Sequence, residues 1–165
     1  MRALTSVAAL MAVAGMVACG GDDGTSAATP LSVLDADFVP ASILGLEVEE
    51  EDVEESLDRR TRTYLDAVGM YSVRDDELLQ ATLQISRFRD DVDHDRSAFQ
   101  HSIITQIGSS APRAYRIGDR TVWLTTGKSQ QVTIWFSEGY LYVLGVRDDF
   151  RQGRTLLRGL LETLP

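Results

Sequence analysis

Cysteine, histidine and lysine are scarce in this chain of 165 residues, which has one cysteine, two histidines and one lysine. A single cysteine, Cys19, excludes an internal disulfide and any zinc or iron–sulfur site built from several cysteines. His94 and His101 lie seven positions apart and have no third ligand in sight, so they do not predict a zinc site. With 44% hydrophobic residues, the chain is too apolar to be wholly disordered.

A positive net charge is also lacking, since the formal charge is −9. Binding to nucleic acid needs a basic surface that releases phosphate counterions, so we expect no nucleic-acid partner. The acidity is local: positions 22–58 hold 12 acidic residues and no basic one, whereas positions 59–165 hold 15 basic and 13 acidic residues. The charge therefore describes one segment of the chain and not the remainder.

The chain has no hydrophobic run long enough to span a bilayer as a helix. Met1 and Arg2 give a short positive start, and the next 16 residues, Ala3 to Ala18, carry no charge. At about 1.5 Å per residue these would reach only about 24 Å, short of a hydrocarbon core of about 30 Å. Residues 1–18 are therefore predicted to be a signal peptide.

The end of this stretch, Met16-Val17-Ala18-Cys19, resembles the lipobox of bacterial lipoproteins, although Met16 stands where leucine is usual. The resemblance implies that Cys19 is lipidated through a thioether, and that residues 19–30 form a flexible tether. Two acyl chains give stable anchoring, so the membrane is an expected partner and the extracytoplasmic face the expected location. The alternative is an ordinary secretory signal in which Cys19 is only a small apolar residue.

Residues 31–165 are predicted to form a single α+β domain. Leu31 to Glu47 is expected to be an irregular lead-in, followed by a helix from about Glu49 to Val68 that ends at Gly69. The acidic run Glu49 to Asp52 would complement the helix macrodipole at that N-terminus. The alternative interpretation of this run is a patch that binds a cation or a partner.

Three hairpins are predicted from alternating apolar residues and turn signals. The strands are 70–74 with 78–88, 113–117 with 120–126, and 130–137 with 140–147. One face of strand 78–88 is expected to be buried and the other to be polar. A helix capped by Asp93 or Asp95 should run to Ile107, and a last helix should start near Asp148. Together they indicate a mostly antiparallel sheet of about five or six strands with helices packed on it, with an α/β/α sandwich as one form.

The aromatic residues of the last strands suggest a ligand-facing surface. A two-residue turn at Glu138-Gly139 places Trp135 opposite Tyr142, and a five-residue loop between the two preceding strands would place Trp123 opposite Trp135. Trp123, Trp135 and Tyr142 would then line an open groove for an amphiphilic ligand. The alternative is that helices cover both faces of the sheet there.

Asp91, Asp93 and Asp95 are weak candidate metal ligands with the alternating spacing of an EF-hand start. An EF-hand needs glycine at its sixth position and glutamate at its twelfth, where this chain has Arg96 and Ser102. A solvated turn is therefore the preferred interpretation, and no metal or other cofactor is expected.

Catalytic motifs are missing from the sequence: it has no G-x-S-x-G elbow, phosphate-binding loop or dinucleotide fingerprint. The stretches 70–74, 79–88 and 122–127 resemble small lipoproteins of high-GC Gram-positive bacteria, which have no assigned activity. The ending from Trp135 to Leu164 is similar to the close of the Mog1/PsbP-like fold, which implies binding without catalytic residues to carry over. We therefore expect a lipid-anchored binding or interaction module, not an enzyme. The alternatives are a carrier or sensor of an apolar ligand and a hydrolase with an unrecognised site.

Overall fold

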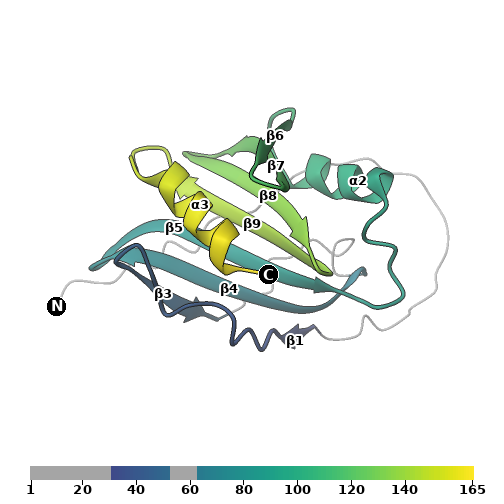
Figure 1. The fold of residues 1–165 in the computed structure, drawn as a ribbon, viewed down its shortest axis with the longest axis horizontal. Helices are drawn as coiled ribbons and strands as arrows, with labels where there is room; N and C mark the ends of the chain where they lie inside the picture. The colour runs from purple at the N-terminus through teal and green to yellow at the C-terminus, as the bar shows by residue number, and fades with distance from the viewer. Residues whose placement is uncertain (1–30, 53–62) are drawn as a thin grey trace.

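The computed structural model describes residues 31–52 and 63–165, which form one nine-stranded sheet and two helices (Figure 1). The predicted signal peptide, Cys19 and the tether lie outside these residues. Along the sheet the strands are β2 (Ser42–Ile43), β3 (Leu46–Glu51), β4 (Leu65–Asp75), β5 (Leu78–Phe88), β9 (Tyr140–Arg147), β8 (Gln130–Ser137), β7 (Arg120–Gly127) and β6 (Arg113–Ile117). All these neighbours are antiparallel, and β1 (Ser32–Val33) pairs parallel with β4. A mostly antiparallel α+β fold is confirmed, but five or six strands were too few.

The three predicted hairpins are confirmed as β4–β5, β6–β7 and β8–β9. The last of these turns at Glu138 and Gly139, which both have positive φ (48° and 82°) as a two-residue hairpin turn of the right twist requires. Ser137 pairs with Tyr140 and Trp135 with Tyr142, as predicted. Local turn chemistry therefore determines the pairing within each hairpin.

The helix predicted from Glu49 to Val68 is wrong at both of its ends. Glu49 to Glu51 belong to β3, and Leu65 to Val68 belong to β4, which continues through Gly69. The middle of the predicted helix lies outside the described residues. Glutamate favours helices in isolation, but here Arg74 forms ion pairs with Glu49 and Glu51 across the strand pair, both at 3.0 Å. Tertiary contacts thus override the local preference.

The first described helix, α2 (Ser97–Ile107), ends at Gly108 as predicted, but its start is different. Arg96 is the residue that precedes the helix, and no side chain caps the first turn. Neither Asp93 nor Asp95 is the cap. The first turn of α2 contains no acidic residue, so charge does not stabilise this helix at its N-terminus, and packing through Ile103 and Ile104 must do so.

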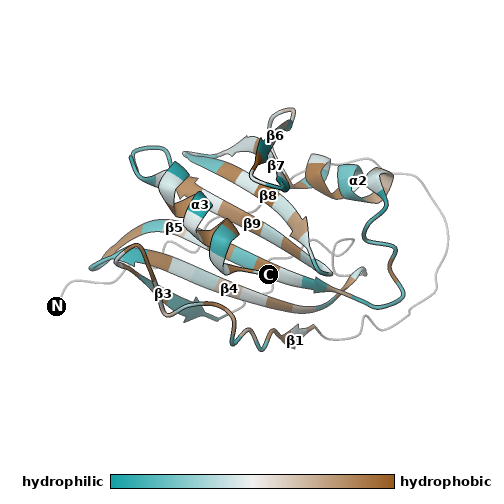
Figure 2. Cartoon of the chain, viewed as in Figure 1, coloured by the Kyte–Doolittle hydropathy of each residue, from teal (hydrophilic) through white to brown (hydrophobic). Residues whose placement is uncertain are grey.

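The last helix, α3 (Gly153–Thr163), packs its apolar side on the sheet (Figures 1 and 2). Leu156, Leu157, Leu160 and Leu161 are all buried there, and the helix begins at Gly153 and not near Asp148 as predicted. Arg120 donates to the carbonyl oxygens of Leu164 (2.9 Å) and Pro165 (3.0 Å). A guanidinium on the last carbonyls also complements the negative end of the helix.

The two helices lie against opposite faces of the sheet. Side chains alternate across a strand, so Trp135 and Tyr142 join the cluster under α3, whereas Ile134 and Val143 join the cluster under α2. No helix among the described residues is long and apolar enough to cross a membrane.

Strand β5 has the polar face that its alternation predicts, but three of the polar side chains on it are buried. Gln80, Gln84 and Ser86 are all less than a tenth exposed, and Gln84 donates to the Ser86 hydroxyl at 3.0 Å. Alternation distinguishes the two faces of a strand but does not show which of them meets solvent.

Candidate binding pocket

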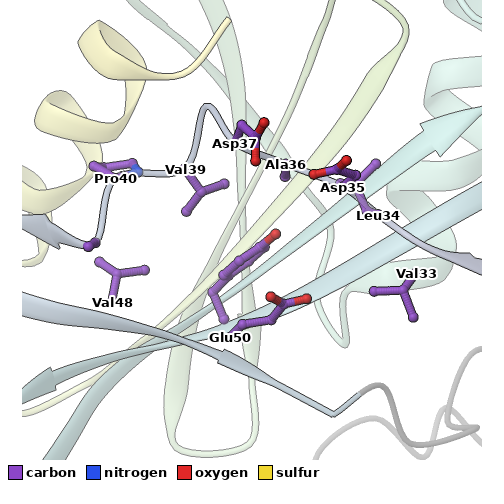
Figure 3. Close-up of a pocket in the computed structure, with 11 residues that line it drawn as sticks. Val33, Leu34, Asp35, Ala36, Asp37, Val39, Pro40, Val48 and Glu50 are labelled. Carbon is purple, nitrogen blue, oxygen red and sulfur yellow. The ribbon is translucent and has the colours of Figure 1, made fainter.

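An open pocket with a volume of about 650 Å³ lies between the segment that follows β1 and strands β3 and β4 (Figure 3). We call it the lead-in pocket, lined by Val33, Leu34, Asp35, Ala36, Asp37, Val39, Pro40, Ala41, Val48, Glu50 and Tyr71. Asp35 and Asp37 lie on one side of the opening and Glu50 on the other (Figure 3). Among these described residues the walls are therefore largely apolar and the charged groups are all acidic.

Three main-chain hydrogen bonds hold the lead-in segment in place. Leu34 N–H donates to the Val68 carbonyl of β4 at 3.0 Å, and the Leu34 side chain is only 2% exposed. The Val39 N–H donates to the Ala36 carbonyl, which turns the chain, and Val48 N–H of β3 donates to the Ala41 carbonyl at 3.0 Å. These bonds keep Asp35 and Asp37 on a loop whose ends are fixed to the sheet.

Glu50 reaches the pocket because β3 is a strand. Successive side chains point to opposite faces, so Val48 and Glu50 share the face with the pocket, while Glu49 and Glu51 lie on the other face. There Arg74 pairs with both glutamates, and hydrogen bonds from Ser72 first and then Arg74 lower the pKa of Glu51. The strand thus places the Glu50 carboxylate at the pocket and the two carboxylates that pair with Arg74 on the opposite face.

Tyr71 is the most deeply buried polar side chain of the pocket, with 6% of its surface exposed. Its ring crosses Gly69, where a Cβ would lie 2.9 Å from the Tyr71 hydroxyl oxygen. Burial first, and then the charges of Glu50 and Asp35, raise the pKa of this hydroxyl. Within residues 31–52 and 63–165 the hydroxyl has no hydrogen-bond partner.

The carboxylates of the pocket lack basic partners among the described residues. Elsewhere on the surface, Asp66 pairs with Arg87, Asp91 with Arg89 and Asp149 with Arg147. None of Asp35, Asp37 and Glu50 has such an ion pair in the described part of the chain, and no lysine or arginine lines the pocket. The site therefore combines unneutralised acidic groups with an unpartnered hydroxyl.

The aromatic groove expected at Trp123, Trp135 and Tyr142 does not form, because the register of β7 differs from the predicted one. Gly127 pairs with Gln130 across a two-residue turn, so Trp123 faces Ile134 and lies on the opposite side of the sheet from Trp135. Trp135 and Tyr142 are 0% exposed and stack under α3, with ring centroids 4.9 Å apart. The interpretation that helices cover both faces accounts for these two residues.

Trp123 lies half-buried beside α2. It packs edge-on against Phe136 and lines a smaller groove of about 450 Å³. The other residues lining this α2 groove are Ser97, Ala98, Gln100, His101 and Ile104. Of the described residues that line it only His101 is titratable, which distinguishes the α2 groove from the acidic lead-in pocket.

The aspartates at positions 91, 93 and 95 do not converge. Arg89 holds Asp91 through two hydrogen bonds of 2.9 and 3.1 Å, which lower the pKa of this carboxyl, and Asp95 pairs with His94 Nδ1 at 3.2 Å. No group of three histidine, cysteine, aspartate or glutamate side chains in the described ranges could hold a metal ion.

In the sequence, Glu50 stands out only as one residue of an acidic run, and Asp35, Asp37 and Tyr71 belong to no recognisable motif. The usable signal was the alternation Leu46, Val48 and Glu50 against Glu47, Glu49 and Glu51, which is typical of a strand. The long-range pairing that brings Asp35 beside Tyr71 has no local signature. Comparison with family models, curated proteins and solved structures found no match for this chain.

Proposed function

We propose that this chain is a lipid-anchored, extracytoplasmic binding module that holds its ligand in the lead-in pocket and performs no catalysis. The observation that carries the binding role is the preformed cavity lined by Tyr71, whose hydroxyl has no hydrogen-bond partner among the described residues. A ligand that forms a hydrogen bond with this hydroxyl would gain about 0.5–1.5 kcal/mol. A volume of about 650 Å³ is also within the usual range for ligand pockets.

The anchoring role is supported by the sequence around Cys19 and by the polar stretch that follows it. We expect cells that produce the full chain with an alkyne palmitate analogue to attach the label to it, and the Cys19→Ala variant to remain unlabelled. Mass spectrometry of the labelled peptide should place the acyl groups on Cys19. Absence of label from the original chain would contradict anchoring and leave the pocket proposal untouched.

A direct binding test uses the full chain carrying ¹³C-labelled alanine methyl groups. Ala36 and Ala41 line the lead-in pocket, Ala98 lines the α2 groove, and Ala67 and Ala81 lie in the core. The probes are butylamine, butanol and butyrate, which share one stem length and differ in the head group. Binding in the pocket predicts shifts at Ala36 and Ala41 with at least one probe. If all three probes leave both methyl groups unmoved, the proposed function is wrong.

A second candidate is a carrier of an amphiphilic ligand in the α2 groove. It is favoured by the half-buried Trp123 ring beside Ile104 and by a lining whose described residues include no acid. Butanol shifts confined to the Ala98 methyl would support this candidate over the lead-in pocket.

A further inference from the structure

The charged residues that line the lead-in pocket in the described part of the chain have a single sign. Asp35 and Asp37 approach from the lead-in segment and Glu50 from β3, and none of the described lining residues is basic. Glu50 is the direct cross-strand partner of Tyr71, and the charges of Asp35 and Glu50 both act on the Tyr71 hydroxyl. An anionic ligand would be repelled here, whereas a cation would be attracted at a range set by the salt concentration.

The cation cannot be a bare metal ion held by side chains alone, because the acidic groups do not converge closely enough. The described residues contain no cluster of three candidate ligands at metal-binding distances. The carboxylates stand instead on opposite sides of an opening between apolar walls (Figure 3). Such spacing suits a larger cation whose several N–H groups reach different acceptors.

The walls add a requirement for an apolar stem. Val39, Pro40 and Val48 form apolar surface beside the acidic groups, and Val39 and Val48 pack against the core under α3. Each buried methylene of a ligand should strengthen binding by about fourfold, so an alkyl chain on the cation would raise its affinity.

We infer that the lead-in pocket binds an organic cation, an ammonium or guanidinium group on a short alkyl stem. The head group donates to the carboxylates of Asp35 and Glu50 and to the Tyr71 hydroxyl oxygen, and the stem lies against Val39 and Val48. This inference rests on the proposed function, because it names the ligand class of the same pocket. The ligand is either a free amine or the side chain of a lysine or arginine in a peptide.

The three head groups of the methyl-labelling experiment test the inference. We expect butylamine, as its ammonium ion, to shift the Ala36 and Ala41 methyl signals at concentrations at which butanol and butyrate have no effect. Higher sodium chloride should weaken the response, because exposed charges are screened. Equal or stronger shifts with butanol or butyrate would overturn the inference while the proposed function stands. If no probe shifts the Ala36 or Ala41 methyl signal, both the inference and the proposed function are wrong.

Substitutions of the acidic residues test which carboxylates bind the cation. The double variant Asp35→Asn/Glu50→Gln should weaken butylamine binding by about fivefold, since each exposed ion pair contributes about 0.2–1 kcal/mol. The control for the Glu50 half of this variant is Glu47→Gln, which removes one carboxylate from the same strand on the opposite face and should leave the affinity unchanged. If Glu47→Gln weakens butylamine binding as much as the double variant does, the affinity depends on general surface charge and not on the carboxylates of the pocket.

The Tyr71→Phe variant tests the buried hydroxyl separately. It keeps the ring over Gly69 and should weaken butylamine binding by about threefold, the loss of one modest hydrogen bond. Unmoved core signals from Ala67 and Ala81 would show that the fold is intact. An unchanged affinity in a folded variant would remove Tyr71 from the site.

Nα-acetyl-lysine N-methylamide and its arginine counterpart distinguish the two sources of the cation. Tighter binding than butylamine supports a peptide side chain, because the backbone then adds contacts. Equal or weaker binding supports a free amine. If neither derivative and no amine shifts Ala36 or Ala41, the cation assignment is wrong.

Discussion

Trp135 contains the one buried side-chain nitrogen or oxygen atom that lacks a hydrogen-bond partner in the described part of the chain, its Nε1. The indole is 0% exposed and nearly parallel to the Tyr142 ring, at an interplanar angle of 3°. Stacking therefore fixes the position of the ring, and its N–H group is buried at a cost.

We expect Trp135→Phe to change the free energy of unfolding by less than about 1 kcal/mol, because removal of an unpaired buried donor offsets the lost apolar volume. Trp135→Ala, which also removes the stack on Tyr142, should cost about 3–5 kcal/mol. Urea unfolding followed by far-ultraviolet circular dichroism measures both values. If Trp135→Phe lowers the free energy of unfolding nearly as much as Trp135→Ala does, the buried indole N–H does not destabilise the protein.

Single residues also show where prediction from sequence stops. The pairing of Trp135 with Tyr142 followed from a two-residue turn at Glu138-Gly139 and is confirmed. The pairing of Trp123 with Trp135 assumed a longer loop, and the structure turns instead with a positive φ at Ser129. One residue of register decides which face a side chain occupies, and serine is a weak signal for such a turn.

At the scale of elements, the junction after α2 depends on close packing. Gly108 ends the helix with an ordinary negative φ of −97°, so its glycine is not required by backbone conformation. A Cβ there would collide with the Thr125 side chain, including its Cβ at 2.7 Å. Thr125 is buried, and its hydroxyl donates a hydrogen bond to the Ser110 carbonyl oxygen at 2.9 Å, so the side chain has little freedom to move away.

Gly108→Ala should therefore lower the free energy of unfolding by about 1–3 kcal/mol, as expected for overpacking. Gly159→Ala in α3 is the matched control, since its Cβ would meet the flexible end of Ile43 at 3.3 Å and alanine favours a helix by about 1 kcal/mol. Thermal unfolding of both variants tests the contrast. Equal losses at the two positions would contradict the role assigned to Thr125.

Hairpins were predictable and the β3 region was not, for one physical reason. A hairpin is specified by its turn residues and by the alternation of its two strands, all close in sequence. The β3 strand depends on Arg74, which lies 23 residues after Glu51 and forms an ion pair with it at 3.0 Å. Local helix preference of the glutamates gives no indication of that distant partner. The lead-in pocket depends on the same distant pairing and was missed with it.

For the whole molecule, the two most buried tyrosines couple stability to alkaline pH. Burial is the main cause that raises the pKa of both Tyr71 and Tyr142 above the usual value of 10.0. The unfolded chain then releases these protons at a lower pH than the folded chain does. Since the folded state holds more protons above pH 10, the free energy of unfolding falls as the pH rises through that range.

We expect urea midpoints measured at increasing pH to decline from about pH 10 upward. The Tyr71→Phe/Tyr142→Phe variant should show a shallower decline, although it starts from a lower stability because the hydrogen bond from Tyr142 to the Pro165 carbonyl is lost. Parallel declines of the two proteins would contradict the assignment to these tyrosines.

The strand order has a consequence for how the molecule is assembled. Strands β1 to β5 pair among themselves, as do β6 to β9, and one ladder, between Ala81–Arg87 and Tyr140–Val146, joins the two groups. Pairing within each group closes shorter loops than the β5–β9 ladder does, and shorter loops cost less entropy to close. We therefore expect two partly formed sheets that merge along the β5–β9 ladder, with the cavity-bearing half formed from the earlier part of the chain.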